Sequence, residues 1–365
     1  MPAQPAPSVQ QQAVNAQNLP PVKVALLLPL SGKNRDLGQS MLQAAQLALF
    51  SMGYPAFQLM PHDSKATPDG ARDAAEAAIA EGSQLILGPL FSAEVKAVKP
   101  VAGSHGINVV AFSTDWAQAG GNTFVMGFLP FSQVQRIVEY AASHGYHRIG
   151  LIAPVSDYGN AVTGFYQALI SRHGLQTAPV AHIPPGKGGM PGLAETFMQN
   201  GLPMVDAVLI AVGGEQAAAV SAQLTAAGLG PDQVKRLGTG LWDESTLSSN
   251  PDFRGAWYAA PQPDARRAFE KKYWDTYPQA PPRLATLSYD ATALAAVLAR
   301  NGAARNIESF GRIALSNPNG FSGIDGIFRF RQDGMIDRGM AVLQMNSGAV
   351  VVIDQAPKTF QRMAY

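Results

Sequence analysis

Polar side chains follow several apolar runs of this sequence, at positions where a parallel β-strand would end. Ser31 comes after the run at 22–28, Ser92 follows "QLILG" (84–88), and Ser113 closes "INVVAFS" (107–113). Ser92 has two possible roles, to cap the helix that begins "SAEV" or to contact a ligand. Hydroxyls and the backbone N–H groups that begin a helix can hold a carboxylate or a neutral polar group. Ligands gather outside the carboxyl ends of strands in open parallel sheets, so this pattern indicates a small-molecule site. The candidate ligand-binding residues are Ser31, Leu90, Phe91, Ser92, Ser113, Thr114, Asp115, Tyr158, Gly240, Trp242 and Asp243.

Motifs for phosphate or dinucleotide binding are incomplete. Gly32 and Lys33 look like the end of a P-loop, but that loop needs a glycine where Leu27 stands, and Ser or Thr where Asn34 stands. The stretch "GTGLWD" (238–243) has Asp where a dinucleotide-binding motif needs its third glycine. We therefore expect neither kind of ligand.

Histidines and acids do not assemble into a catalytic or metal site. His144 and His147 have a spacing that can bind a metal, but Gly145 separates them at an expected helix end, so solvent-exposed side chains are favoured. Asp63 after His62 fits either half of a proton relay or an Asx-type hydrogen bond that orders the strand end, and the second is favoured. The sequence predicts no catalytic residue, no metal ligand and no cofactor.

Composition limits the remaining function classes. The chain has 365 residues, with 27 Lys plus Arg against 26 Asp plus Glu, so it lacks the basic excess typical of nucleic-acid binding. It contains no cysteine, which removes disulfides and thiolate chemistry. No apolar run approaches the roughly 18 residues that a transmembrane helix needs.

The first 21 residues, "MPAQPAPSVQQQAVNAQNLPP", are rich in Pro, Gln and Ala and carry no charged side chain. Such a composition cannot build a core and predicts a flexible tether. We hypothesise that the natural chain begins with a secretion signal, with a lipid-anchored cysteine that would fix the protein to the outer membrane.

Apolar strands alternate with helices from residue 22 onward. Continuous apolar strands that alternate with helices predict a parallel sheet covered on both faces. The expected elements of the first series are strands at 22–28, 57–61, 84–88 and 107–113 and helices at 37–52, 69–80 and 92–101.

The same alternation restarts after "TFVMGFLP" (123–130) and predicts a second α/β lobe. The expected elements of this series are strands at 147–154, 178–184, 207–212 and 234–240 and helices at 131–144, 159–173, 193–200 and 215–227. A further strand is expected at 255–261, where the tail begins.

The tail departs from this rhythm. Three expected helices, at 264–276, 284–300 and 306–315, precede "GIFRF", "MAVLQM" and "AVVVID", which alternate like one antiparallel meander. We expect the helices to return to the first lobe and the meander to complete the second, which requires three inter-lobe crossovers. The predicted division is a tether at 1–21, lobe 1 at 22–129 plus 260–324, and lobe 2 at 130–259 plus 325–365.

The strand-end motifs, taken in order, resemble those of the type I periplasmic binding proteins over about residues 22–355. The motifs are "VALLLPLSG", "LILGPLFSAEVKAVKPVA", "INVVAFSTD", "RIGLIAPVSDYG", "GTGLWD" and "SYDATALAAVLA". Within that superfamily the chain resembles the penicillin-binding-protein activator lipoproteins, which are related to the leucine-binding proteins. The resemblance implies a two-lobed Venus-flytrap α/β fold, with parallel sheets flanked by helices and three crossovers.

The resemblance also implies roles for individual residues. Amino-acid binders of this fold hold the ligand's α-carboxylate after the third and fourth strands, which corresponds here to Ser92, Ser113 and Thr114. Tyr158 matches the aromatic residue that closes from the second lobe. The acid that neutralises the α-ammonium belongs near "GTGLW", and the nearest acid is Asp243. A buried ammonium without a counter-ion costs several kcal/mol, which argues against ordinary amino-acid binding.

Two bulky aromatic residues bear on the same site. Phe91 and Trp242 are large enough to fill a cleft, and Trp242 is suited either to a cleft wall or to packing inside the protein.

Two functions follow from these observations. The first is a non-enzymatic, lipid-anchored periplasmic protein that resembles activators of peptidoglycan synthases, with a penicillin-binding protein as partner. The alternative is the solute-binding protein of an ABC importer for branched-chain or other amino acids, with a permease as partner and a small polar or amino-acid-like ligand. Neither requires nucleic acid or a transmembrane span.

Overall fold

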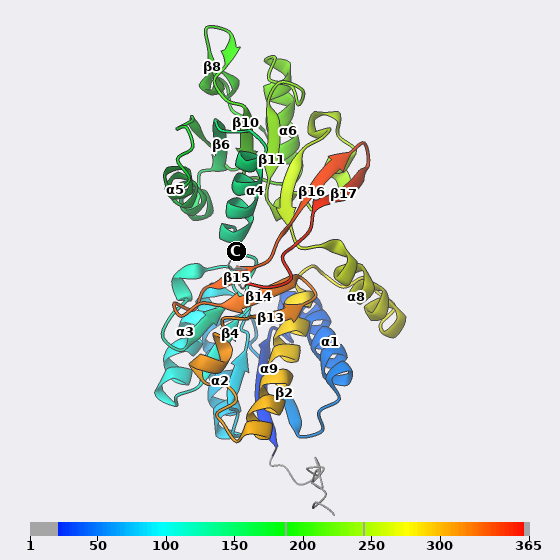
Figure 1. Ribbon diagram of the computed structural model, residues 1–365. Coiled ribbons are helices and arrows are strands. Elements are labelled where there is room, and N and C mark those ends of the chain that lie inside the picture. Colours follow the sequence, from blue (N-terminus) through cyan, green and yellow to red (C-terminus); the bar gives the residue numbers. More distant parts are fainter. Residues whose placement is uncertain (1–20, 187, 244, 361–365) are drawn as a thin grey trace, which may run out of the picture. The chain divides into compact units, whose positions relative to one another are not determined.

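The computed structural model describes residues 21–186, 188–243 and 245–360, which form two compact units (Figure 1). Unit 1 contains the chain up to Ser113, together with Gly121–Thr123 and Pro282–Leu315. Unit 2 contains Thr114–Gly120, Phe124–Pro281 and the chain from Ser316 onward.

The predicted tether and its lipid anchor lie outside the described residues, except for Pro21. Over the residue ranges that the structure covers, none of the helices combines the length and the apolar content needed for a membrane crossing.

The bounds of the units differ from the predicted lobe boundaries. The segment 260–281 groups with unit 2, where Arg266 forms an ion pair with Asp243. The segment 316–324 also groups with unit 2. In that unit the backbone N–H of Val125 donates to the carbonyl of Gly334 at 2.9 Å. Contacts distant in sequence therefore decide the division, and the sequence pattern does not display them.

Unit 1 is built on a parallel sheet in the order β2-β1-β3-β4, which β5 extends. The edge strand β2 contains Pro61, whose missing N–H costs nothing at an unpaired edge. The strands of this sheet are β1 (Val22–Leu28), β2 (Phe57–Asp63), β3 (Leu85–Leu87), β4 (Asn108–Ala111) and β5 (Thr123–Val125).

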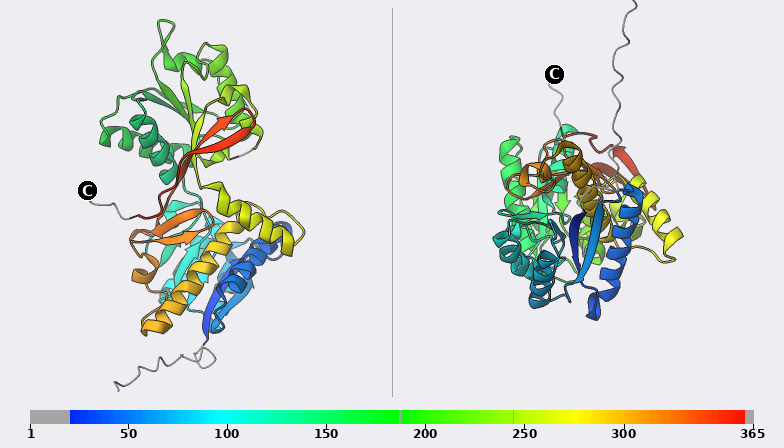
Figure 2. Two further views of the ribbon diagram at one scale, coloured as in Figure 1. Left: turned by 45° about the vertical axis from the view of Figure 1, so that its right-hand side comes forward. Right: turned by 90° about the horizontal axis from the view of Figure 1, so that it is seen from below.

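Helices cover both faces of this sheet, as the unbroken apolar strands predict. Ala25 and Leu27 of β1 pack against α2 and α3, while the alternate residues Val24 and Leu26 are buried on the opposite face. Helices α1 and α9 pack together, as do α2 and α3, and the strands lie between α1 and the α2/α3 pair (Figure 2). The helices are α1 (Arg35–Met52), α2 (Pro68–Ala80), α3 (Ser92–Ser104), α9 (Ala285–Arg305) and α10 (Arg312–Leu315).

Unit 2 is built on a seven-stranded sheet in the order β17-β16-β12-β11-β10-β6-β7. The five strands from β12 to β7 are parallel, and the β16–β17 hairpin adds antiparallel strands at one edge (Figure 2). The strands are β6 (Ile149–Pro154), β7 (Val180–Ile183), β10 (Ala207–Ile210), β11 (Lys235–Gly238), β12 (Trp257–Ala260), β16 (Ala341–Asn346) and β17 (Ala349–Asp354).

Two apolar cores flank the seven-stranded sheet. Leu209 of β10 faces α4 and α5, and its neighbours Val208 and Ile210 face α6. The helices of unit 2 are α4 (Phe131–Ser143), α5 (Asp157–Arg172), α6 (Gly214–Ala226), α7 (Ser245–Ser248) and α8 (Pro263–Thr276). The predicted α/β fold with parallel sheets flanked by helices is confirmed.

Three predicted elements are wrong. Residues 193–200 form a 3₁₀ turn, η4 (Ala194–Phe197), and the start of a short hairpin, β8 (Met198–Gln199) with β9 (Leu202–Pro203). The helix predicted at 306–315 is limited to α10. The predicted single meander is divided between two sheets. The strands β13 (Phe321–Gly323), β14 (Gly326–Phe330) and β15 (Ile336–Arg338) form a sheet of their own, while β16 and β17 join the large one.

Candidate functional site

In unit 1, Asp63 ties the ends of β1 and β2 together. Its Oδ1 accepts hydrogen bonds from the backbone N–H of Leu30 and of Lys65, both at 2.8 Å. Burial alone would raise the pKa of Asp63, but these bonds and one from the Ser31 hydroxyl outweigh it and hold the pKa below its ordinary value. Asp63 thus makes the predicted Asx-type bond, and Ser31 is engaged with it.

The turn after β3 brings the start of α3 close to β1. Gly88 has φ +85°, and a Cβ there would lie 2.3 Å from the carbonyl oxygen of Leu27, so only glycine fits. Leu90 and Phe91 follow, and Ser92 is the first residue of α3. This geometry aims the first N–H groups of the helix at the carboxyl edge of the sheet.

The N-terminus of α3 is capped by Glu94, whereas the sequence left capping as one of two roles for Ser92. The Glu94 Oε2 accepts the Phe91 N–H at 3.0 Å, and Glu94 is only 1 % exposed. Burial raises the pKa of this carboxyl above its ordinary value, even though the Phe91 bond favours the charged form. Ser92 is the first residue of the helix and has an interaction of its own, so its contact with a ligand stays a prediction.

The residues after β4 differ in exposure. Ser113 is buried, Thr114 is exposed, and Asp115 caps the 3₁₀ turn η3 (Trp116–Gln118). Asp115 accepts the Ala117 N–H with one carboxylate oxygen and the Gln118 amide with the other, both at 3.0 Å. Its carboxylate is therefore satisfied locally.

In unit 2, Tyr158 lies in the first turn of α5, beside the end of β11. Its hydroxyl shares a hydrogen bond with the fully buried Thr239, while burial raises the pKa of the phenol above its ordinary value. Gly240, which follows Thr239 in the chain, donates its N–H to Oε1 of Gln133 on α4 at 2.7 Å. The residues that follow β11 are therefore joined to the first turns of α4 and α5 by side-chain bonds.

Trp242, predicted as a cleft residue, is a core residue of unit 2. It is 0 % exposed, its indole N–H donates to the carbonyl of Val212 at 2.9 Å, and its ring meets Phe253 edge to face at 4.9 Å. A Cβ on Gly238 would lie 2.2 Å from the indole, so that glycine makes room for it. Of the two roles that the sequence allows, packing is the one that these contacts describe.

Asp243 is bonded to two side chains of unit 2. Its Oδ2 forms an ion pair with Nη1 of Arg266 on α8, and its Oδ1 accepts the Tyr258 hydroxyl at 3.4 Å. Both members of the ion pair are about four-fifths buried, with 20 % and 21 % of their side chains exposed. A ligand ammonium at this carboxylate would compete with a guanidinium that is already in place.

The predicted site residues thus gather at the strand ends of their own units. Ser31, Leu90, Phe91, Ser92 and Ser113 do so in unit 1, and Tyr158, Gly240 and Asp243 do so in unit 2. Sequence reasoning missed Glu94 as a helix cap and Gln133 and Thr239 as buried partners. The signal for Glu94 was available, since Glu three residues after a helix start is typical of a cap. The sequence held no signal for Gln133, because its hydrogen-bond partner Gly240 is 107 residues away in the chain.

Within the described ranges, no three His, Cys, Asp or Glu side chains are placed to hold a metal ion. His144 and His147 are exposed at the end of α4, as the sequence predicted.

Solved structures of similar proteins share the fold. A branched-chain amino acid ABC transporter protein from Rhodospirillum rubrum matches with a TM-score of 0.81 and 19 % identity, over 91 % of this chain and 100 % of its own. A solute binding protein of an ABC transporter from R. palustris, in complex with benzoate, matches with a TM-score of 0.61 and 18 % identity, over 92 % of this chain and 97 % of its own.

A sequence relative covers less of the chain. An uncharacterized protein of Rickettsia prowazekii (strain Madrid E) is 22 % identical over 149 residues, 41 % of this chain. The match spans only 40 % of the length of that relative.

These comparisons overturn the first of the two predicted functions. The matched solved structures are described as ABC transporter proteins, which agrees with the alternative function and not with an activator of peptidoglycan synthases. The predicted penicillin-binding-protein partner depended on that function and is not supported either. Most of the motifs that suggested it lie at strand ends and helix starts of the shared fold, so they do not by themselves separate one branch of the superfamily from another.

The family is shown by a match over nearly the whole described chain. The model for the family described as periplasmic binding protein matches residues 21–349. The match runs from β1 to the first residue of β17, and the strand-end site residues of both units fall inside it. This chain belongs to the periplasmic binding protein family.

Proposed function

We propose that this protein is the substrate-binding protein of an ABC importer, and that its ligand is a branched-chain or other amino acid, or a related small carboxylic acid. The observation that carries the proposal is the family match over residues 21–349. One similar structure is described as a branched-chain amino acid transporter protein and another holds benzoate. Those two ligands share a carboxylate and an apolar body, and this chain's strand ends offer groups for a carboxylate.

The carboxylate would bind at the start of α3. Helix N-termini carry unpaired N–H groups and a partial positive charge, which favour an anion. Ser92 begins the helix in unit 1, and Thr114, whose side chain is exposed, comes three residues after β4 and is grouped with unit 2. The nearest acids are occupied, because Glu94 caps the helix and Asp63 accepts two backbone N–H groups. A carboxylate at the start of α3 would therefore meet hydrogen-bond donors.

The structure supports a site for the ammonium of an amino acid less well than a site for its carboxylate. Asp243, which the resemblance pairs with that ammonium, already holds Arg266 and the Tyr258 hydroxyl. Removing one partner from a buried ion pair is costly, since the other charge is left unpaired. We therefore expect binding to depend on the carboxylate and to tolerate loss of the ammonium.

A thermal-shift screen followed by calorimetry tests the proposal. The panel contains the branched-chain amino acids, benzoate, and leucine paired with isocaproate, its analogue without the ammonium. A ligand at a hundred times its Kd adds about 2.7 kcal/mol of stability, which a melting curve detects readily. We expect at least one carboxylate to stabilise the protein, and isocaproate to bind within about tenfold of leucine, a difference of about 1.4 kcal/mol. No shift with any member of the panel would contradict the proposal.

Two substitutions locate the site. Ser92→Ala and Thr114→Ala each remove a hydroxyl donor to the carboxylate, which should weaken binding by about 1–3 kcal/mol. Ser104→Ala is the matched control, because Ser104 is exposed at the other end of the same helix, where it bonds the carbonyl of Val101. Unchanged affinity in both Ser92→Ala and Thr114→Ala would move the site elsewhere.

The same proposal includes a non-enzymatic role in the periplasm and an ABC permease as the partner. Loss of uptake of the bound ligand in a strain that lacks this gene would support it. The outer-membrane lipid anchor stays a prediction, and labelling of the natural gene product with a radioactive fatty acid tests it.

A further inference from the structure

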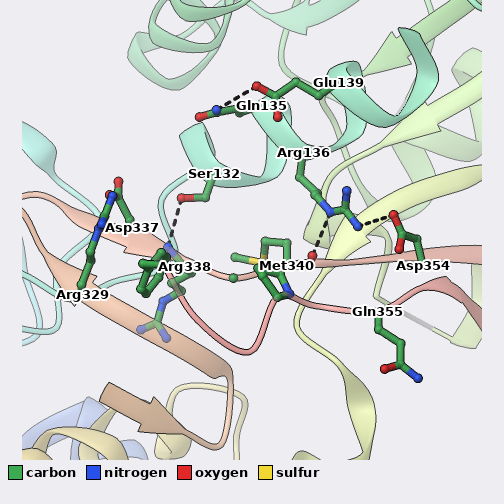
Figure 3. A pocket seen from close by; sticks show the side chains of 13 residues that line it. Ser132, Gln135, Arg136, Glu139, Arg329, Asp337, Arg338, Met340, Asp354 and Gln355 are labelled. Atoms are coloured by element: carbon green, nitrogen blue, oxygen red, sulfur yellow. Dashed lines mark hydrogen bonds and ion pairs between the residues drawn. The ribbon is translucent and has the colours of Figure 1, made fainter. Parts of the chain in front are cut away.

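A pocket of about 540 Å³ lies wholly within unit 2, and none of the predicted site residues lines it. Ser132, Gln135, Arg136 and Glu139 point into it from one face of α4 (Figure 3). The opposite wall is formed by the β14–β15 hairpin, the link after β15, and the residues that follow β17. We call this cavity the α4 pocket. Its volume is in the range of about 300–1,000 Å³ that is typical of small-molecule sites.

Opposite charges in the α4 pocket are balanced and largely paired. Arg136 Nη2 lies 2.6 Å from Asp354 Oδ2, and Arg329 Nε lies 3.0 Å from Asp337 Oδ2. Glu139 accepts the Gln135 amide at 2.9 Å. A charged ligand that binds at either of these two ion pairs would have to displace one member, and the displaced partner would be left without its counter-ion. The pocket therefore favours a ligand without net charge.

The same paired groups keep unused hydrogen-bonding positions. Arg136 uses Nε for the carbonyl of Met340 at 3.0 Å and Nη2 for Asp354, which leaves Nη1. Asp354 and Asp337 each use one carboxylate oxygen. In the portion of the chain that the structure covers, neither the spare oxygens nor Nη1 has a hydrogen-bond partner. Donors and acceptors thus alternate around one space, which suits groups that donate and accept at once, as hydroxyls do.

These groups are also held in place before any ligand arrives. The backbone N–H of Arg338 donates to the Ser132 hydroxyl at 3.2 Å, which fixes the link after β15 against α4. The Arg338 guanidinium is buried against the rings of Phe128 and Phe328 and donates to the carbonyl of Met126 at 2.9 Å. A pre-organised frame reduces the entropy that binding costs.

An apolar side completes the α4 pocket. Met340, Pro357 and Phe360 line it, and the Arg329 guanidinium lies 4.6 Å above the Phe360 ring. Planar polar groups on one side and an apolar wall on the other match a molecule that has a ring of hydroxyls and a C–H face. We propose that the α4 pocket binds a neutral sugar, at a site separate from the strand ends.

Saturation-transfer NMR with the full chain tests this proposal. The probes are glucose, galactose, N-acetylglucosamine and maltose, each at about 10 mM, a concentration that detects millimolar affinity. Glucuronate is the charged comparison. Calorimetry with the strongest sugar then compares the wild type with Asp354→Asn and Gln355→Ala. Gln355 is exposed and lines the pocket, so its truncation spares the fold and guards against failure of the first variant to fold.

We expect transfer from at least one neutral sugar, and affinity reduced about tenfold in both variants, the effect of losing about 1.4 kcal/mol. Asp232→Asn is the matched control, because its ion pair with Arg254 at 2.7 Å is exposed and outside the pocket, and its affinity should stay at the wild-type value. Three results would overturn the proposal: no transfer from any neutral sugar, transfer from glucuronate alone, or wild-type affinity in both variants.

Discussion

Trp242 allows a decisive test, because the sequence leaves it two roles and the structure describes one. Its indole is 0 % exposed, lies edge to face with Phe253 and donates to the Val212 carbonyl. If the side chain belongs to the core of unit 2, its removal should cost stability and leave ligand affinity unchanged. If it belongs to a ligand-binding wall, the reverse should hold.

The expected cost follows from these contacts. Trp242→Ala removes the largest fully buried side chain of the core and leaves a cavity, for which losses of about 3–5 kcal/mol are typical. Trp242→Phe keeps an aromatic ring but takes the N–H donor from Val212, which should cost about 1–3 kcal/mol. For a domain of this size each kcal/mol lowers Tm by roughly 2–4 °C, so the alanine variant should melt roughly 6–20 °C lower.

Urea unfolding followed by circular dichroism measures the free energy, and calorimetry with the ligand found in the carboxylate screen measures affinity. Trp274→Ala is the matched control, since this tryptophan on α8 is 56 % exposed and its loss should change stability by less than about 0.5 kcal/mol. A Trp242→Ala variant with wild-type stability and abolished ligand binding would refute the assignment to the core.

Two further predictions concern pH. At Asp63, hydrogen bonds outweigh burial and hold the folded-state pKa below the ordinary 3.8, so its contribution to stability is complete above that pH and is lost as the pH falls through the folded-state value. Asp63→Asn should flatten the acid limb of a stability curve measured by urea unfolding, and an unchanged limb would contradict this. Burial lowers the pKa of Lys235 to about 8, so the unfolded chain binds more protons and stability should rise between about pH 8 and 10.5. Lys235→Met should abolish that rise, whereas Lys271→Met, at a side chain 77 % exposed, should retain it.

The parallel strands were predictable because burial on both faces leaves an unmistakable pattern. The run at 22–28 is apolar at nearly every position, and β1 has those bounds in the structure. The sequence prediction ended this helix at residue 101, yet α3 continues past Pro100 to Ser104. A proline weakens a helix locally, and the packing of Val95, Val98 and Ala102 on the sheet overrides that loss.

Short elements were not predictable in the same way. Residues 193–200 contain apolar residues at helical spacing, but Leu193 and Phe197 are buried by a single 3₁₀ turn, and the chain then reverses at Asn200, which has positive φ. The strands of the tail alternate correctly, but alternation does not say which strand is the neighbour. The choice of sheet depended on β15, three residues long and too short to give a pattern of its own.

The candidate site was also predictable only in part. The position of the hydroxyls at strand ends follows from the local sequence, since a polar residue directly after an apolar strand has no other place. The partners of the acids do not, because Arg266 reaches Asp243 across 23 residues and Leu30 reaches Asp63 across 33. The sequence near "GTGLWD" indicated that Asp243 is the nearest acid to the expected ammonium position. The structure adds that Asp243 already forms an ion pair with Arg266.

This pairing has a consequence for recognition. An unpaired carboxylate at these strand ends would repel an anionic ligand, by about 4 kcal/mol at 4 Å for an effective dielectric constant of about 20. Asp63 and Asp115 accept hydrogen bonds from backbone and amide N–H groups, Glu94 accepts the Phe91 N–H, and Asp243 forms an ion pair with Arg266. Under the proposed function, a carboxylate at the start of α3 would meet N–H donors, while the acids of unit 1 nearest to it are engaged in bonds of their own. The proposed carboxylate site therefore depends on these internal bonds as well as on the N-terminus of α3.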